Sequence, residues 1–143
     1  MRRAALAAPN GPTSSSAGVE RMLSRVAESL YWTARYVERA ENVTRLLDVE
    51  YHALLDAHVS DHGEAWQQLV ALLGDTEAFA EHFDAFTAHN VADWLLWHDG
   101  NPNAVASCIT AARENARSVR EQISGEMWEA INSLFLLVGR ANR

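Results

Sequence analysis

One long amphipathic helix is predicted from residue 23 to residue 56, a stretch that contains neither Gly nor Pro. Apolar and small residues recur along it at alternating steps of four and three, which is the spacing of a heptad seam and requires a partner helix. At about 1.5 Å per residue the helix is roughly 50 Å long. The seam comprises Val26, Leu30, Thr33, Val37, Ala40, Thr44, Leu47, Tyr51 and Leu54.

The opposite face of the same helix carries a second stripe, made of charged, amide and aromatic residues. It comprises Glu28, Tyr31, Trp32, Arg35, Glu38, Arg39, Asn42 and Arg45. A solvated helix face rarely combines forked guanidinium groups with large aromatic rings. The first helix is therefore expected to have two tasks, one on each face.

Three short helices are predicted between residues 64 and 99, with aromatic and aliphatic residues at helical spacing. They are expected at residues 64–73, 76–86 and 91–99, with Gly74 ending the first, Asp75 or Thr76 capping the second and Asn90 capping the third. Phe79, Phe83 and Phe86 mark one face of the second helix, and Trp94 is expected to turn inward in the third. Together the three helices would form a cap at one end of the domain.

A second long helix is predicted from residue 103 to about residue 138. Asn101 and Pro102 precede it in the order of an N-cap and a first helical residue. Gly125, inside it, would cost about 1 kcal/mol relative to Ala and suggests a close backbone approach. Cys108 lies on its apolar face and is expected to be a small buried hydrophobe. Its polar residues echo those of the first helix: Arg113, Glu114, Asn115, Arg117, Arg120 and Glu121, followed by Glu126 and Trp128.

These elements predict an all-α fold with two long antiparallel helices and three short helices between them, forming an incomplete helical bundle. The helical domain is expected to cover residues 22–138. A disordered leader over residues 1–21 and a tail over residues 139–143 would flank it.

Charge and composition exclude several classes of function. The chain has twelve basic residues, all Arg, and a net charge of −7. Residues 46–112 contain no basic residue but eleven carboxylates and all six His, so nucleic-acid binding is not expected. No apolar run is long enough for a membrane span. One Cys excludes an internal disulfide, and we expect a soluble, cytoplasmic protein.

Several separated blocks resemble one known family. The segments MLSRVAESLYWTARYVERAENVTRLLDV, GD-x-x-x-FAEHF and NPNAVASCITAARENARSVREQISGEMWEAIN are similar to the amino-terminal half of the Alpha-E family, an all-α bacterial domain with a Glu-Arg motif. The resemblance covers about residues 22–132. Family members continue with further helices, so the chain resembles a fragment, and the final SLFLLVGRANR departs from that continuation.

The resemblance implies a setting rather than a reaction. Family members are encoded beside circularly permuted ATP-grasp proteins and transglutaminase-like proteins, which suggests ATP-dependent amide-bond formation on a peptide-like substrate. This chain contains no Gly-rich phosphate loop and no G-x-S-x-G motif. The first hypothesis is therefore a non-catalytic interaction domain for an ATP-grasp or transglutaminase-like partner. Its contact surface would be the acidic middle or the polar stripe.

The second hypothesis is a site for an amino-acid-like or peptide ligand, with or without catalysis. A carboxylate or phosphate would be held by Arg35, Arg39, Arg113 and Arg117, an amine by Glu28, Glu38 and Glu126, and the walls would be Tyr31, Trp32 and Trp128. The alternative is that these groups pair within and between helices as a polar seam that fixes the register. The exposure of the four arginines distinguishes the two.

No cofactor or metal is expected. Asp48, His52 and Asp56 lie at intervals of four residues, but the chain contains no Glu-x-x-His pair of the kind that builds metal centres in helical bundles. A bundle that lacks half of its helices would leave its seams exposed, so we also expect a homodimer or an aggregation-prone fragment.

Overall fold

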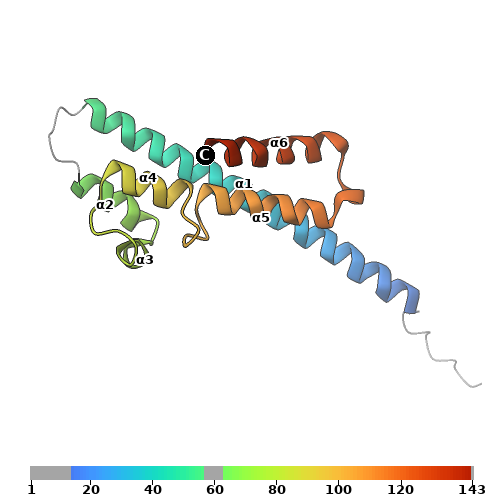
Figure 1. The fold of residues 1–143 in the computed structure, drawn as a ribbon. Helices are drawn as coiled ribbons and strands as arrows, with labels where there is room; N and C mark the ends of the chain where they lie inside the picture. The colour runs from blue at the N-terminus through green and yellow to red at the C-terminus, as the bar shows by residue number, and fades with distance from the viewer. Residues whose placement is uncertain (1–13, 57–62, 143) are drawn as a thin grey trace, which may run out of the picture.

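The computed structural model describes residues 14–56 and 63–142, which are helical with no strand in those ranges (Figure 1). The predicted all-α class is confirmed. The elements are α1 (Ser14–Asp56), α2 (Gly63–Leu72), α3 (Thr76–Ala80), α4 (Ala88–Leu96), α5 (Val105–Ser118), a 3-10 turn (Arg120–Gln122) and α6 (Gly125–Ala141).

Helix α1 is the axis on which the other helices are placed (Figure 1). Helix α5 runs antiparallel to it and makes the most extensive helix–helix contact in the fold. Helix α6 turns back and packs on α5, whereas α2, α3 and α4 gather beside the carboxyl-terminal part of α1. The first long helix, its antiparallel partner and the cap of short helices therefore have the predicted arrangement.

The prediction of one continuous second long helix is wrong. Helix α5 ends at Ser118 and α6 begins at Gly125. The Ser124 side chain accepts a hydrogen bond from the Met127 backbone N–H at 3.2 Å. The extended backbone of Ser124 and its hydroxyl make it an N-cap that starts a new helix. A Cβ added to Gly125 would meet nothing within 4 Å, so the expected close approach is also absent.

The turn before α5 also differs from the prediction. Asn101 is buried and lies in a turn, where its side-chain oxygen accepts from the Asn103 N–H at 2.9 Å and its amide donates to the Trp94 carbonyl at 3.0 Å. Helix α5 starts two residues later than predicted, at Val105. Asn101 thus ties the loop to the end of α4 rather than capping α5, because the Trp94 carbonyl belongs to the last turn of α4.

The boundaries of the short helices follow local hydrogen bonds. Gly74 ends α2 with φ of 78°, and the Asp75 N–H bonds the Val70 carbonyl at 3.2 Å, as in a Schellman motif. Helix α4 begins at Ala88, three residues earlier than predicted, because Thr87 and not Asn90 is its N-cap. The Gly74 stop is confirmed, and the Asn90 cap is wrong.

Helix α3 is shorter than predicted but keeps its aromatic cluster. It ends at Ala80 instead of residue 86, and Asp75 precedes it without a side-chain capping bond. The Phe79 ring is fully buried and its centroid lies 5.0 Å from that of Phe83 and 4.6 Å from that of Phe86. The predicted inward face is therefore present although half of the helix is not.

Small residues dominate the contact between α1 and α5. On α1 the fully buried seam residues are Thr33 and Ala40, joined by Val43 from outside the predicted seam, and α5 opposes them with Cys108, Ala112 and Ala116. Small side chains bring the two helices close together. Tyr51, placed in the seam by its spacing, is 50% exposed.

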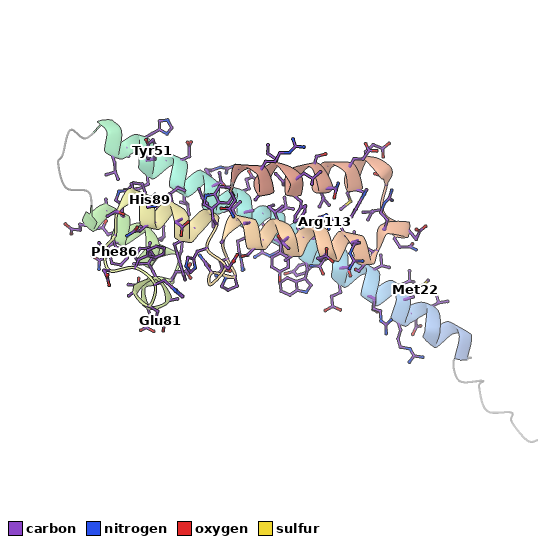
Figure 2. All side chains as sticks on the ribbon, in the orientation of Figure 1. Met22, Tyr51, Glu81, Phe86, His89 and Arg113 are labelled. Atoms are coloured by element: carbon purple, nitrogen blue, oxygen red, sulfur yellow. The ribbon has the colours of Figure 1, made fainter. Side chains whose placement is uncertain are left out.

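The ends of the domain extend beyond the predicted bounds. Helix α1 begins at Ser14, so residues 14–21 are helical rather than a disordered leader, and residues 1–13 lie outside the described residues. Met22 lies on the part of α1 that extends past the other helices (Figure 2). At the other end, residues 139–141 belong to α6 and not to a tail.

Candidate functional site

The arginines of the two stripes do not converge between α1 and α5. On α1, Arg35 pairs with Glu38 at 2.5 Å and Arg45 pairs with Glu41, one helical turn apart in each case. All four side chains are about half exposed or more. These are surface ion pairs along one helix, which contribute little to stability, and they do not form a dry seam between helices.

On α5, Arg113 and Arg117 share one carboxylate. Arg117 and Arg113 lie 2.8 Å and 3.1 Å from the Glu114 oxygens, and the hydrogen bond from Arg117 is the main reason that the pKa of Glu114 is lowered. Arg113 also donates to the Asn132 side chain at 2.8 Å on α6 (Figure 2). Arg113 therefore connects α5 to α6 and is not available to a ligand.

The aromatic residues of the stripes are separated as well. Tyr31 and Trp32 contact each other edge to face at 5.4 Å on the exposed surface of α1. Trp128 lies on α6, where the Arg113 and Arg120 guanidinium carbons are 5.5 Å and 5.8 Å from its ring centre. The three rings do not wall one pocket.

The remaining stripe residues are also dispersed. Glu28 and Asn42 are exposed on α1, and Asn115 is half-buried on α5. Glu126 lies in the first turn of α6, where its own backbone N–H and then the Ser124 hydroxyl lower its pKa. The thirteen residues predicted from the sequence therefore do not form a single site.

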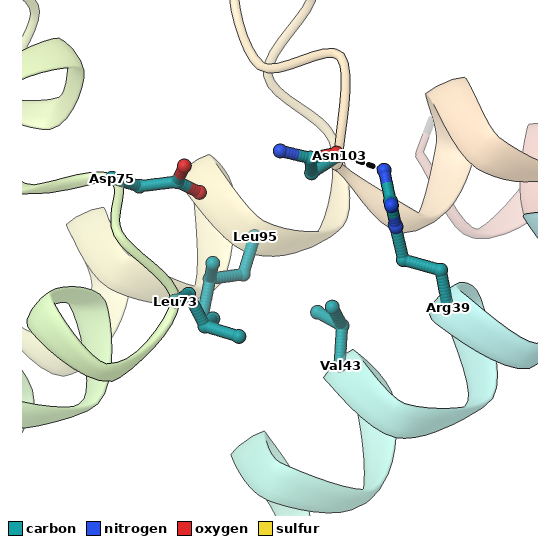
Figure 3. A pocket seen from close by; sticks show the side chains of 6 residues that line it. All are labelled: Arg39, Val43, Leu73, Asp75, Leu95 and Asn103. Carbon is teal, nitrogen blue, oxygen red and sulfur yellow. Dashed lines mark hydrogen bonds between the residues drawn. The ribbon is translucent and has the colours of Figure 1, made fainter.

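Among the stripe arginines in the described residues, Arg39 and Arg120 have no carboxylate partner, and Arg120 lies over the Trp128 ring. The Nη1 of Arg39 donates to the Asn103 side-chain oxygen at 2.6 Å. Arg39 lines a pocket of about 220 Å³ together with Val43, Leu73, Asp75, Leu95 and Asn103 (Figure 3). A smaller neighbouring pocket of about 130 Å³ shares Arg39, Val43 and Leu73 and adds Arg35, Glu38 and Asn42.

Sequence reasoning missed Asp75 and Asn103 as pocket residues. Asp75 follows the Gly74 stop and was considered only as a cap, while Asn103 was placed inside a helix. Asp75 and Asn103 line one pocket because the turn after α2 and the turn before α5 lie close together. The signal was the pair of turns, Gly74-Asp75 and Asn101-Pro102, but their proximity is a tertiary property.

An apolar groove follows the side of α1 that is opposite the Arg39 pocket. Its first two parts, of about 390 Å³ and 580 Å³, lie between α1 and α6 and share Val37, and the third, of about 430 Å³, lies between α1 and α4. Thr44 and Asp48 line both the second and the third part. The groove exists because α6 packs on α5 and leaves that side of α1 uncovered.

Other candidate chemistry is not assembled in the described part of the chain. No group of three metal-ligating side chains comes together there. The His52 ring bonds the Asp48 backbone carbonyl at 2.8 Å. Cys108 is fully buried, as predicted, and burial raises the pKa of its thiol while the charge of Arg39 opposes that shift. A thiol in this state is a poor nucleophile.

The Glu-Arg dipeptide at positions 38 and 39, beside the pocket, has a counterpart in a known family. A family described as a predicted alpha-helical domain with a conserved ER motif matches residues 22–142. The chain belongs to the Alpha-E family. Glu38-Arg39 is the one Glu-Arg dipeptide within the matched residues. The Alpha-E match runs past residue 132 and includes most of the final segment that was expected to depart from the family.

Relatives of this Alpha-E chain are much longer proteins. Uncharacterized proteins of Mycobacterium bovis and Mycobacterium tuberculosis are 32% identical to it over 131 residues, which cover 82% of this chain. The aligned region is 15% of each relative. No solved structure matches the chain. Among the helices that the structure describes, none combines the length and apolarity needed to cross a membrane.

Proposed function

We propose that this Alpha-E chain is a non-catalytic interaction domain that holds a helix of a partner protein in the groove along α1. The observation that carries the proposal is the groove itself, which runs from Thr33 to Tyr51 on one side of α1. Nineteen helical residues span about 28 Å at 1.5 Å per residue, which is enough for five turns of a bound helix.

The chemistry of the groove defines its occupant. Its floor is made of small and aliphatic residues such as Val37, Ala40 and Ile131, which accept the apolar face of an amphipathic helix. Its edges carry the carboxylates of Glu38, Glu41 and Asp48. Glu38 and Glu41 pair with arginines on the exposed surface of α1, and Asp48 has no arginine partner among the described residues. The bound helix should therefore have Arg or Lys residues beside its apolar stripe.

The partner follows from the family setting. Family members are associated with ATP-grasp and transglutaminase-like proteins, so a protein of one of these types is the proposed partner, in a bacterial system that forms or modifies amide bonds. The aligned region is 15% of the relative's length, which supports an accessory role beside other domains. An ATP-dependent partner would place the complex in the cytoplasm.

The decisive experiment is co-expression with the neighbouring ATP-grasp protein and measurement of binding by isothermal titration calorimetry. Thr44→Glu tests the groove, since Thr44 is exposed, lines two of its three parts and bonds only the Ala40 carbonyl of its own helix. We expect at least a tenfold loss of affinity from one buried carboxylate. Thr110→Glu is the matched control, because Thr110 is an exposed threonine with the same bond to Ala106 on α5.

Equal binding by the Thr44→Glu and unmodified chains would refute the groove as the contact surface. Gel filtration addresses the expected homodimer. A dimer that dissociates with Thr44→Glu would identify a second copy of this chain, and not another protein, as the occupant. A monomer that binds no 8-anilinonaphthalene sulfonate would contradict both occupants, since the dye reports exposed apolar surface.

A further inference from the structure

We infer that the Arg39 pocket binds a small zwitterion, an amino acid or short peptide with an apolar side chain. The carboxylate of this ligand would be held by Arg39 and its ammonium group would lie near Asp75. The pocket lies on the face of α1 opposite the groove, so this inference goes beyond the proposed docking function and does not depend on it.

The charge of Arg39 is not neutralised by a carboxylate among the described residues. Arg35, Arg113 and Arg117 each contact a carboxylate, whereas Arg39 contacts the neutral amide of Asn103. A guanidinium has five N–H donors in a planar fork that fits the two oxygens of a carboxylate. In the described residues the bond to Asn103 uses Nη1. The other donors of Arg39 remain available for an anion entering the pocket.

Arg39 is also held in place by its partner. Its partner Asn103 donates its backbone N–H to the buried side chain of Asn101, which is anchored in turn on the Trp94 carbonyl. This chain of hydrogen bonds runs from the core to the pocket. A guanidinium whose partner is fixed loses less conformational entropy when a ligand binds.

The size and lining of the pocket favour a small ligand with an apolar part. Val43, Leu73 and Leu95 supply apolar surface between the charged groups (Figure 3). A volume of about 220 Å³ is below the ~300–1,000 Å³ of pockets for drug-sized molecules. The ligand should therefore be small, with one aliphatic side chain against the leucines.

Asp75 supplies a charge of the opposite sign to the pocket. Its carboxylate lies on the other side of the pocket from Arg39, with Asn103 and Leu95 between them in the view of Figure 3. Asp75 does not form a capping bond to α3, and the two charges do not pair with each other. One cation and one anion separated by apolar surface are complementary to a zwitterion and unsuited to a dianion such as phosphate.

The test is a titration of the isotope-labelled chain, followed by the backbone amide NMR signals of Val43, Asp75 and Asn103. L-leucine and leucyl-leucine are the probes that distinguish an amino acid from a peptide. N-acetyl-leucine lacks the ammonium group and leucinamide lacks the carboxylate. We expect saturable shifts with leucine, leucyl-leucine or both, with a dissociation constant of about 1 mM. N-acetyl-leucine and leucinamide should bind at least tenfold more weakly.

Arg39→Gln should weaken the binding of leucine at least tenfold, and Arg39→Lys, which keeps the charge but not the fork, should only partly restore it. Arg117→Gln is the matched control on an exposed arginine outside the pocket, and it should bind as the unmodified chain does. Melting curves establish that each variant is folded. Thr44→Glu should also leave this binding unchanged, which separates it from the docking function.

Three results would overturn the inference. Absence of saturable shifts with both leucine and leucyl-leucine would remove the site. Equal affinity of the Arg39→Gln and unmodified chains would remove Arg39 from it. Leucinamide or N-acetyl-leucine binding as tightly as leucine would show that the pocket recognises the apolar side chain alone and not a zwitterion.

Discussion

Asn101 should be among the most sensitive polar positions of the chain. It is 1% exposed, and the change Asn101→Ala removes its bonds to the Trp94 carbonyl at 3.0 Å and from the Asn103 N–H at 2.9 Å. A neutral hydrogen bond contributes a net ~0.5–1.5 kcal/mol, and a buried group left without a partner costs ~1–3 kcal/mol. We therefore expect the free energy of unfolding to fall by roughly 2–4 kcal/mol.

Urea unfolding followed by circular dichroism measures this loss as a lower midpoint at an unchanged slope. Asn90→Ala is the matched control, because Asn90 is an asparagine in the first turn of α4 that makes a single side-chain bond, to the Ala85 carbonyl. The control should lose less than about 1 kcal/mol. A loss below about 1 kcal/mol for Asn101→Ala would refute the idea that this side chain joins α4 to the start of α5.

The other predictions concern charges and the thiol. Arg113→Ala should lower the free energy of unfolding by roughly 1.5–3 kcal/mol, because it removes the bond to Asn132 on α6, whereas Arg117→Ala should change it by less than about 0.5 kcal/mol in the same assay. Cys108 should react with a thiol reagent far more slowly in the folded chain than in urea, since it is buried and burial raises its pKa. The pKa of Glu126 is lowered in the folded chain, so its stabilising effect is present above the usual value of 4.5 and is lost as the pH falls below it. Glu126→Gln should reduce the dependence of the melting temperature on pH in that acidic range.

Local patterns were sufficient for much of the fold. The long amphipathic α1, the Gly74 stop and the buried positions Trp94 and Cys108 all follow from residue spacing and turn chemistry. These features depend on a few neighbouring residues, so a single sequence contains the information. The family was also recognisable, because several separated blocks occur in the right order.

The break after α5 could not be decided in the same way. The apolar residues of α5 and α6 keep one helical phase through Val119 and Ile123, and a Ser-Gly pair is tolerated inside many helices. The chain turns because Ser124 caps a new helix whose apolar face then packs on α5. Local capping and continued helix formation differ by about 1 kcal/mol, so tertiary packing determines which of them occurs.

The polar stripes did not form one site because small buried residues occupy the contact between α1 and α5, and the arginines lie on other faces of both helices. Because α6 folds back, Arg113 bonds to Asn132 and its guanidinium lies 4.6 Å from the centre of the Phe135 ring. Arg39 bonds to Asn103 in the loop before α5, and an open pocket lies beside it. The same reversal leaves the other side of α1 uncovered, so the turn at Ser124 determines where the docking groove lies. The Arg39 pocket is built instead by α1, α4 and the turns that precede α3 and α5.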